Sequence, residues 1–153
     1  MHNAPEDEFL LTRRRVLRYL LVGSGMVLPG MAFGNAADAL IDAIVGERKA
    51  ETGELKLTTP AIAENGNTVP ITVEAGGPFQ GDQYVKAIHI FAVDNPTPEV
   101  ITFNFTPRAG LAKTSTRIRL AKTQQVVAVA ELSDGRVWRT ANEVKVTIGG
   151  CGG

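Results

Sequence analysis

The sequence has little of the chemistry that most catalytic or metal-binding sites require. Its 153 residues include one cysteine, Cys151, and two histidines. A single cysteine excludes both an internal disulfide framework and a zinc site built from several cysteines. Lys plus Arg and Asp plus Glu both number 16, so no basic excess indicates nucleic-acid binding. Because the sequence also lacks a phosphate-binding loop, metal-ligand spacing and a paired-carboxylate motif, we predict no catalytic residues, no metal and no resident cofactor.

The N-terminal segment is typical of protein export. Residues 12–18 (TRRRVLR) match the twin-arginine motif, with Arg13 and Arg14 as the arginine pair. The apolar stretch that follows is interrupted by glycines and a proline, and it is shorter than the roughly 20 residues that a membrane span needs. We therefore predict that residues 1–37 are a twin-arginine signal peptide, cleaved most simply after Ala37. The mature protein is then expected in the periplasm, away from the membrane, and a retained membrane anchor is the alternative.

The rest of the chain predicts one helix followed by short strands. Apolar residues recur at helical spacing over residues 36–51, and Gly53 is the expected stop. From Leu55 the apolar period changes to two, and Trp138 is the expected core aromatic. The pattern indicates an all-β fold, an immunoglobulin-like antiparallel β-sandwich with one N-terminal helix, over residues 38–148. The expected strands are 55–58, 68–74, 84–93, 100–106, 114–120, 126–132, 136–140 and 143–148.

The strongest predicted strand, at residues 84–93, is apolar on both faces. One face of a sandwich strand normally meets water, so something must cover the second face of this one. The sequence leaves two candidates, a protein partner and the N-terminal helix. The two faces carry Val85, Ala87, His89, Phe91 and Val93 on one side, and Ile88, Ile90 and Ala92 on the other.

The chain closes with two glycines, the cysteine and two more glycines. Glycine has no Cβ and resists regular structure, and at up to ~3.5 Å per residue the tail can carry the thiol about 10 Å beyond the last strand. We therefore predict a flexible carrier arm over residues 149–153, with Cys151 as its reactive residue. Frayed chain or a buried cysteine is the plainer alternative. The residues that give the arm flexibility and clearance are Gly149, Gly150, Gly152 and Gly153.

Nothing near Cys151 in the sequence would activate it as a catalytic nucleophile. A catalytic cysteine needs a base or a positive field that lowers its pKa. His89 lies in the middle of a predicted strand, where a structural role is expected, and the chain-terminal carboxylate opposes thiolate formation. We predict that the protein is not an enzyme and that partner enzymes act on its thiol.

Two stretches resemble the SoxY family, the sulfur carriers of bacterial thiosulfate oxidation. Residues 144–153 (VKVTIGGCGG) closely resemble the family's ending, and residues 60–73 (PAIAENGNTVPITV) look like its early strand region. The resemblance implies a SoxYZ complex with a SoxZ-like subunit. It implies that Cys151 receives thiosulfate through a SoxAX-like haem protein and that a SoxB-like hydrolase releases sulfate. A sulfur dehydrogenase, where one is present, would oxidise the remaining persulfide sulfur.

Two other functional classes stay open on the sequence. One is an exported β-sandwich interaction module whose lone cysteine forms an intermolecular disulfide. The other is a thiol-dependent redox or metal-handling protein, which would need more thiols or histidines than the chain contains.

Overall fold

The computed structural model describes residues 36–77, 79 and 82–150. The predicted arginine pair of the export motif, Arg13 and Arg14, lies outside the described residues, as do Cys151, Gly152 and Gly153. No helix within the described part of the chain is long and apolar enough to cross a membrane.

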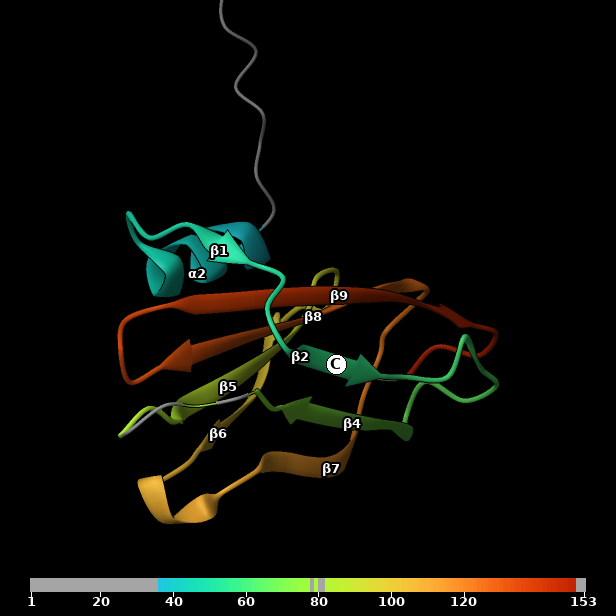
Figure 1. The fold of residues 1–153 in the computed structure, drawn as a ribbon. Helices are drawn as coiled ribbons and strands as arrows, with labels where there is room; N and C mark the ends of the chain where they lie inside the picture. Colours follow the sequence, from blue (N-terminus) through green and yellow to red (C-terminus); the bar gives the residue numbers. More distant parts are fainter. Residues whose placement is uncertain (1–35, 78, 80–81, 151–153) are drawn as a thin grey trace, which may run out of the picture. The chain divides into compact units, whose positions relative to one another are not determined.

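Two β-sheets pack face to face and form the sandwich that the sequence predicts (Figure 1). The larger sheet has the order β1-β9-β8-β5-β6, with β3 also paired to β9, and the smaller sheet has the order β2-β4-β7. Neighbouring strands are antiparallel except where β1 and β3 run parallel to β9. The bounds are β1 Ala50–Glu51, β2 Leu55–Thr58, β3 Ile62–Ala63, β4 Val69–Ala75, β5 Val85–Ala92, β6 Glu99–Asn104, η1 Pro107–Ala109, β7 Ala112–Ile118, β8 Gln124–Leu132 and β9 Val137–Val146.

The main core lies between the two sheets and follows from strand alternation. Ile118 and Leu120 point into it and are buried, while Arg117 and Arg119 are exposed, as the sequence predicts. Trp138 belongs to the same core and is 4% exposed, which confirms it as the core aromatic. Burial of this kind contributes roughly 1.5–3 kcal/mol for each large apolar side chain. The sandwich therefore has a core of its own without any disulfide.

Helix α2 (Ala36–Val45) covers the outer face of the larger sheet (Figure 1). Ile41 of the helix is buried against Phe91 of β5, in a second cluster that also contains Val127, Val129 and Val137. Of the two candidates for the second apolar face of β5, the N-terminal helix covers the part at Phe91 and Val93.

The helix is shorter than predicted and ends at Val45 rather than at residue 51. Gly46 adopts a φ of 60° and ends it, and the Gly46 N–H donates to the Asp42 carbonyl at 2.7 Å. A left-handed residue just after the last helical turn is a common helix stop, and glycine adopts that conformation without steric cost. The segment after the stop then pairs as β1 with β9.

Two further details differ from the sequence prediction. The expected strands 136–140 and 143–148 form the single strand β9, paired continuously with β8. The two-residue strands β1 and β3 were not predicted, because two residues carry no detectable alternation. β1 pairs with the start of β9 and β3 with its end, where residues 61–66 lie beside the chain.

Candidate functional site at the root of the arm

The chain remains bonded to its neighbours after β9 ends. The Thr147 N–H donates to the Ala63 carbonyl at 3.1 Å, and the Thr147 hydroxyl donates to the Glu64 carbonyl at 2.9 Å. On the other side, the Val146 N–H donates to Thr123 Oγ1 at 2.9 Å. The segment that leads to Cys151 is therefore held from both sides up to Thr147.

Three glycines continue this attachment beyond the strand. The Gly66 N–H donates to the Ile148 carbonyl at 2.8 Å, and the Gly66 carbonyl accepts from the Leu120 N–H at 2.8 Å. The Leu120 carbonyl in turn accepts from the Gly150 N–H at 2.9 Å. We call Gly66, Gly149 and Gly150, with the backbone of Leu120 and Ala121, the glycine clamp.

The backbones of the clamp approach one another too closely for any larger residue. A Cβ at Gly66 would lie 2.2 Å from the Leu120 oxygen and 2.6 Å from the Gly150 nitrogen. A Cβ at Gly149 would lie 2.2 Å from the Ala121 oxygen, and one at Gly150 would lie 2.8 Å from the Gly66 oxygen. Real Cβ atoms essentially never approach other heavy atoms within 3.0 Å. These three positions need glycine because of close backbone packing.

This geometry changes the role expected for the first half of the arm. The sequence predicts Gly149 and Gly150 as flexible hinge residues, but Gly150 is buried and its amide is hydrogen-bonded within the domain. They form the root of the arm, since their absent side chains allow close contact with Ala121 and Gly66, and their flexibility stays a prediction. Cys151, Gly152 and Gly153 lie outside the described residues, so their predicted roles stay predictions.

A buried amide pair supports the segment on which the arm root packs. Asn95 Oδ1 accepts from the Ala121 N–H at 3.0 Å and from Gln124 Nε2 at 2.8 Å. Asn95 Nδ2 donates to the Arg119 carbonyl at 2.9 Å, so the side chain bonds the loop on both sides of Leu120. Asn95 and Gln124 are the buried polar residues of the described structure. The sequence alone gives neither Asn95 nor Gln124 a role, because nothing in it pairs them.

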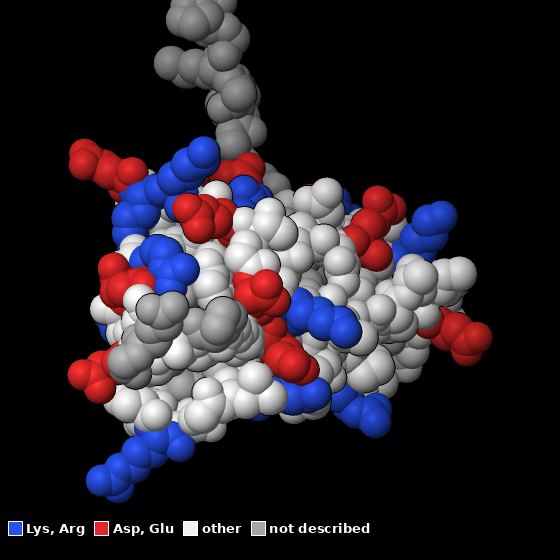
Figure 2. Space-filling model, in the orientation of Figure 1, with Lys and Arg blue, Asp and Glu red and all other residues white. Residues whose placement is uncertain are grey.

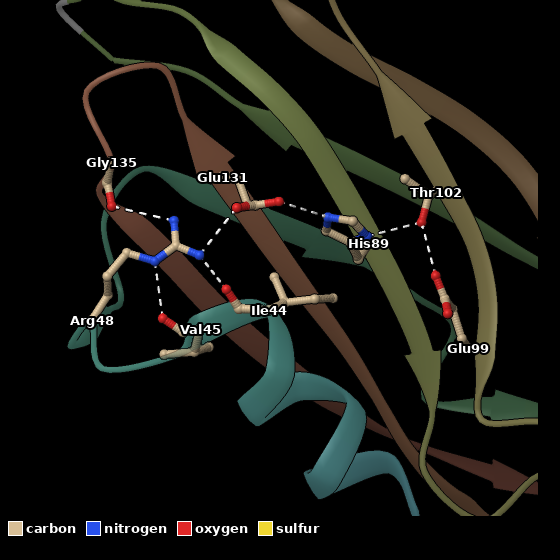
Figure 3. A network of polar contacts seen from close by, with 8 residues as sticks. All are labelled: Ile44, Val45, Arg48, His89, Glu99, Thr102, Glu131 and Gly135. Carbon is tan, nitrogen blue, oxygen red and sulfur yellow. Dashed lines mark hydrogen bonds and ion pairs between the residues drawn. The ribbon is translucent and has the colours of Figure 1, made fainter.

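His89 belongs to a polar network on the outer face of the larger sheet (Figure 3). His89 Nδ1 and Thr102 Oγ1 are 2.9 Å apart, and His89 Nε2 lies 3.3 Å from Glu131 Oε1. Glu131 Oε2 accepts from Arg48 Nη2 at 3.1 Å. Both ring nitrogens of His89 thus contact strand residues rather than the glycine clamp, which agrees with a structural role for this histidine.

Arg48 ties helix α2 to the sheet through the same network (Figure 3). Its guanidinium donates to the carbonyls of Val45, at 2.9 Å, and Ile44, in the last turn of the helix. Burial, the largest single influence, raises the pKa of Glu131, but hydrogen bonds and charge from Arg48 and His89 outweigh it and lower that pKa below its ordinary value. The ionised carboxylate therefore stabilises the attachment of the helix.

The charges on the surface do not form a single-sign field. Lys and Arg alternate with Asp and Glu over the face shown in Figure 2. Among residues 36–77, 79 and 82–150, no three His, Cys, Asp or Glu side chains lie close enough together to hold a metal ion.

Comparisons with known proteins agree on one family. A family model described as "Sulfur oxidation protein SoxY" matches residues 41–151. The solved structure of the sulfur carrier protein SoxY from Chlorobium limicola f thiosulfatophilum is 37% identical, with a TM-score of 0.60, and the match covers 72% of this chain and 96% of that one. No curated protein sequence matched the chain.

Other structures share the fold alone. A superoxide reductase (neelaredoxin) from Ignicoccus hospitalis matches with a TM-score of 0.53 at 18% identity, covering 77% of this chain and 92% of that one. A variant of the same reductase matches with a TM-score of 0.54 at 17% identity, covering 71% of this chain and 86% of that one. At such identities the likeness is one of β-sandwich architecture.

Proposed function

Because the chain belongs to the SoxY family of sulfur oxidation proteins, we propose that it is a covalent sulfur carrier whose attachment point is Cys151. The family match runs through residue 151, so the terminal cysteine falls within the part of the chain that the family shares. The observation that carries the proposal is the position of this thiol. It follows directly after Gly150, whose amide is hydrogen-bonded to the Leu120 carbonyl.

The chemistry begins with oxidative loading of the thiol. The Cys151 thiolate and thiosulfate form a sulfur–sulfur bond and give Cys–S–S–SO₃⁻, while one proton leaves the thiol and two electrons pass to an acceptor. We assign that acceptor role to a SoxAX-like haem protein. Hydrolysis by a SoxB-like enzyme then adds water across the terminal S–S bond and yields a cysteine persulfide and hydrogen sulfate. Neither step needs an acid or base from this chain, since the partner enzymes supply them.

The remaining expectations concern location and partners. The twin-arginine motif at Arg13 and Arg14 supports export to the periplasm. The family supports a general role in the Sox system, and we propose a SoxZ-like subunit as the permanent partner. Where a sulfur dehydrogenase is present, we propose that it removes the persulfide sulfur by oxidation.

The proposal is tested by the intact mass of the protein from cells grown on thiosulfate. Adducts of sulfur or thiosulfate mass should appear, disappear on reduction, and be absent from the Cys151→Ser variant. The same spectra locate the cleavage point of the leader. Residues 36–150 supply the whole described fold, so Cys151→Ser should unfold at the same denaturant concentration as the wild type.

Two outcomes would contradict the proposal. An unmodified thiol under these conditions would remove the carrier function. A plain disulfide dimer, abolished by Cys151→Ser without any defect in thiosulfate oxidation, would favour the interaction module instead.

A further inference from the structure

His89 is a titratable side chain on the outer face of the larger sheet, and the proposed carrier chemistry does not use it (Figure 3). Its side chain is 12% exposed and lies on β5, between β6 and β8. The ring contacts Thr102 Oγ1 of β6 through Nδ1, at 2.9 Å, and Glu131 Oε1 of β8 through Nε2, at 3.3 Å. Thr102 Oγ1 also lies 3.2 Å from Glu99 Oε1. These four side chains therefore form one line of polar contacts across three neighbouring strands.

The donors and acceptors along this line cannot all be satisfied while the ring is neutral. An ionised carboxylate only accepts hydrogen bonds, so Glu99 needs the proton of the Thr102 hydroxyl, and Glu131 needs a proton on His89 Nε2. A Thr102 hydroxyl that donates to Glu99 can only accept from the ring, so it needs a proton on His89 Nδ1. Both ring nitrogens would then donate, which only the imidazolium does. A neutral ring must therefore give up one of the three contacts.

The charge of Glu131 decides which contact the neutral ring gives up. The pKa of Glu131 is lowered, so this side chain is ionised where it faces His89 Nε2. A ring protonated only on Nδ1 would direct the lone pair of Nε2 at the carboxylate, which is repulsive. A ring protonated only on Nε2 keeps its bond to Glu131, and Thr102 turns its hydroxyl proton from Glu99 to His89 Nδ1. The exposed carboxylate of Glu99 then bonds to water instead.

The other charged groups of the surrounding elements do not change this assignment. Arg48, in the segment after α2, meets Glu131 Oε2 at 3.1 Å and lies on the side of that carboxylate away from the ring (Figure 3). The remaining charged residues of α2, of the segment after it and of β5 are exposed: Asp38, Asp42, Glu47, Lys49 and Lys86. Glu131 and Glu99 are thus the carboxylates in line with the ring, one beyond each ring nitrogen.

We propose that His89, Thr102 and Glu99 form a proton-controlled switch at the edge of the larger sheet. When the ring is neutral, the Thr102 hydroxyl donates to His89 and the Glu99 carboxylate is open to solvent. When the ring takes up a proton from solvent on Nδ1, the hydroxyl turns to Glu99 and ties the start of β6 to the ring on β5. Because β6 is the last strand on its side of the sheet, the charge of one largely buried histidine changes what this edge presents.

The test follows the ring nitrogens and the Glu99 carboxyl carbon by NMR between about pH 8 and pH 5, the range in which histidine changes its charge. The two ring-nitrogen shifts report which nitrogen carries the proton, and His89→Gln distinguishes the His89 signals from those of His2. We expect a neutral ring protonated on Nε2. The Glu99 carboxyl signal should shift with the same midpoint as the ring, and that of the exposed Glu143 should not. A neutral ring protonated mainly on Nδ1 would overturn the proposal.

Two substitutions of Thr102 separate the hydroxyl from the charge of the ring. Thr102→Val keeps the branched shape and removes the hydroxyl, so the Glu99 signal should no longer follow the ring. Thr102→Ser keeps a hydroxyl and should retain the response. A Glu99 response of equal size in Thr102→Val would mean that the charge of the ring acts through space, and the switch would be refuted.

Glu131→Gln tests the step that selects the tautomer. A glutamine amide can donate to His89 Nε2, so a neutral ring can then keep its proton on Nδ1 and leave the Thr102 hydroxyl with Glu99. We expect the neutral ring to change toward the Nδ1–H tautomer and the Glu99 response to pH to decrease. A ring that stays in the Nε2–H form in this variant, with the Glu99 response undiminished, would contradict the proposal.

Discussion

Replacing Gly66 with alanine puts a methyl group where the structure has no room for one. The new Cβ would lie 2.2 Å from the Leu120 oxygen and 2.6 Å from the Gly150 nitrogen. Both neighbours are backbone atoms, so no side-chain rotation relieves the overlap. The turn at Gly66 must move away from the arm root, and we expect the glycine clamp to open.

The cost follows from the hydrogen bonds that this movement breaks. Gly66 donates to Ile148 at 2.8 Å, Leu120 donates to Gly66 at 2.8 Å, and Gly150 donates to Leu120 at 2.9 Å. Each such bond contributes about 1 kcal/mol net, so losing all of them costs about 3 kcal/mol. Alanine also restricts the unfolded chain, which returns about 0.4–1 kcal/mol. We therefore expect the free energy of unfolding to fall by about 2 kcal/mol.

The assay is urea denaturation combined with amide hydrogen exchange. Because the urea dependence of small proteins is about 1–3 kcal/mol per M, the midpoint should drop by about 1 M. Exchange at the Gly150 amide should become faster than in the wild type, and amides of the β5–β8 ladder should keep their protection. The exchange measurement separates an opened arm root from a general loss of stability.

Gly76→Ala is the matched control. A Cβ there would meet Leu111 Cδ1 at 3.5 Å, an ordinary contact, and Gly76 is not among the glycines of positive φ. This substitution should be neutral or stabilise by up to about 1 kcal/mol. If Gly66→Ala proved as stable as Gly76→Ala, with an equally protected Gly150 amide, the clamp as described would be refuted.

Two further predictions concern the supports of the fold. Asn95→Ala removes three hydrogen bonds of a buried side chain and should lower the free energy of unfolding by about 2–4 kcal/mol, measured by urea denaturation. Hydrogen exchange at the Gly150 amide should become faster. A cost no larger than that of Asn104→Ala, at an exposed position, would count against the amide support. Because the pKa of Glu131 is lowered in the folded state, its stabilisation is present above the ordinary carboxyl pKa of 4.5 and is lost as the pH falls through the lowered value. Glu131→Gln should thus lower the free energy of unfolding near neutral pH by at most about 1 kcal/mol, since the Arg48–Glu131 pair is partly exposed. The substitution should also weaken the pH dependence of stability below the ordinary carboxyl pKa. An unchanged dependence of stability on acid pH would argue against the network.

Strand alternation made much of the sandwich predictable. Ile118 and Leu120 alternate with Arg117 and Arg119, and the structure buries the first pair and exposes the second. Where alternation is absent the prediction failed, as in the two-residue strands β1 and β3. Local pattern decides such elements only when they are long enough to show a period.

The end of the helix shows a different limit of prediction from the sequence. The sequence predicts Gly53 as the stop, but the helix ends before Gly46; Gly46 and Gly53 both adopt positive φ, 60° and 48°. Arg48 donates to the nearby carbonyls of Ile44 and Val45, and Glu131 of β8 holds its guanidinium in that position, which supports the earlier stop. The contact with Glu131 depends on the sheet beside the helix, which local propensity does not contain.

The root of the arm shows what the composition of the tail cannot decide. The tail composition identified Cys151 and its glycines, and it favoured flexibility for all of them. A glycine kept for conformational freedom and one kept for close backbone approach look the same in a sequence. Gly66, Leu120 and Gly150 are brought together only by the fold, so the fixed part of the arm could not be read from any one segment.

Anchoring at Gly150 shortens the reach that the sequence alone suggests. While the Gly150 amide stays bonded to Leu120, the reach of the thiol is counted from Gly150 rather than from the end of the last strand. Under the proposed carrier function, an enzyme that acts on this thiol must approach the domain surface itself, or the clamp must open first. Ile148, 68% exposed, and Ile62, 59% exposed, lie in the segments that flank the arm root. We therefore expect recognition by partner enzymes to include the sandwich as well as the arm.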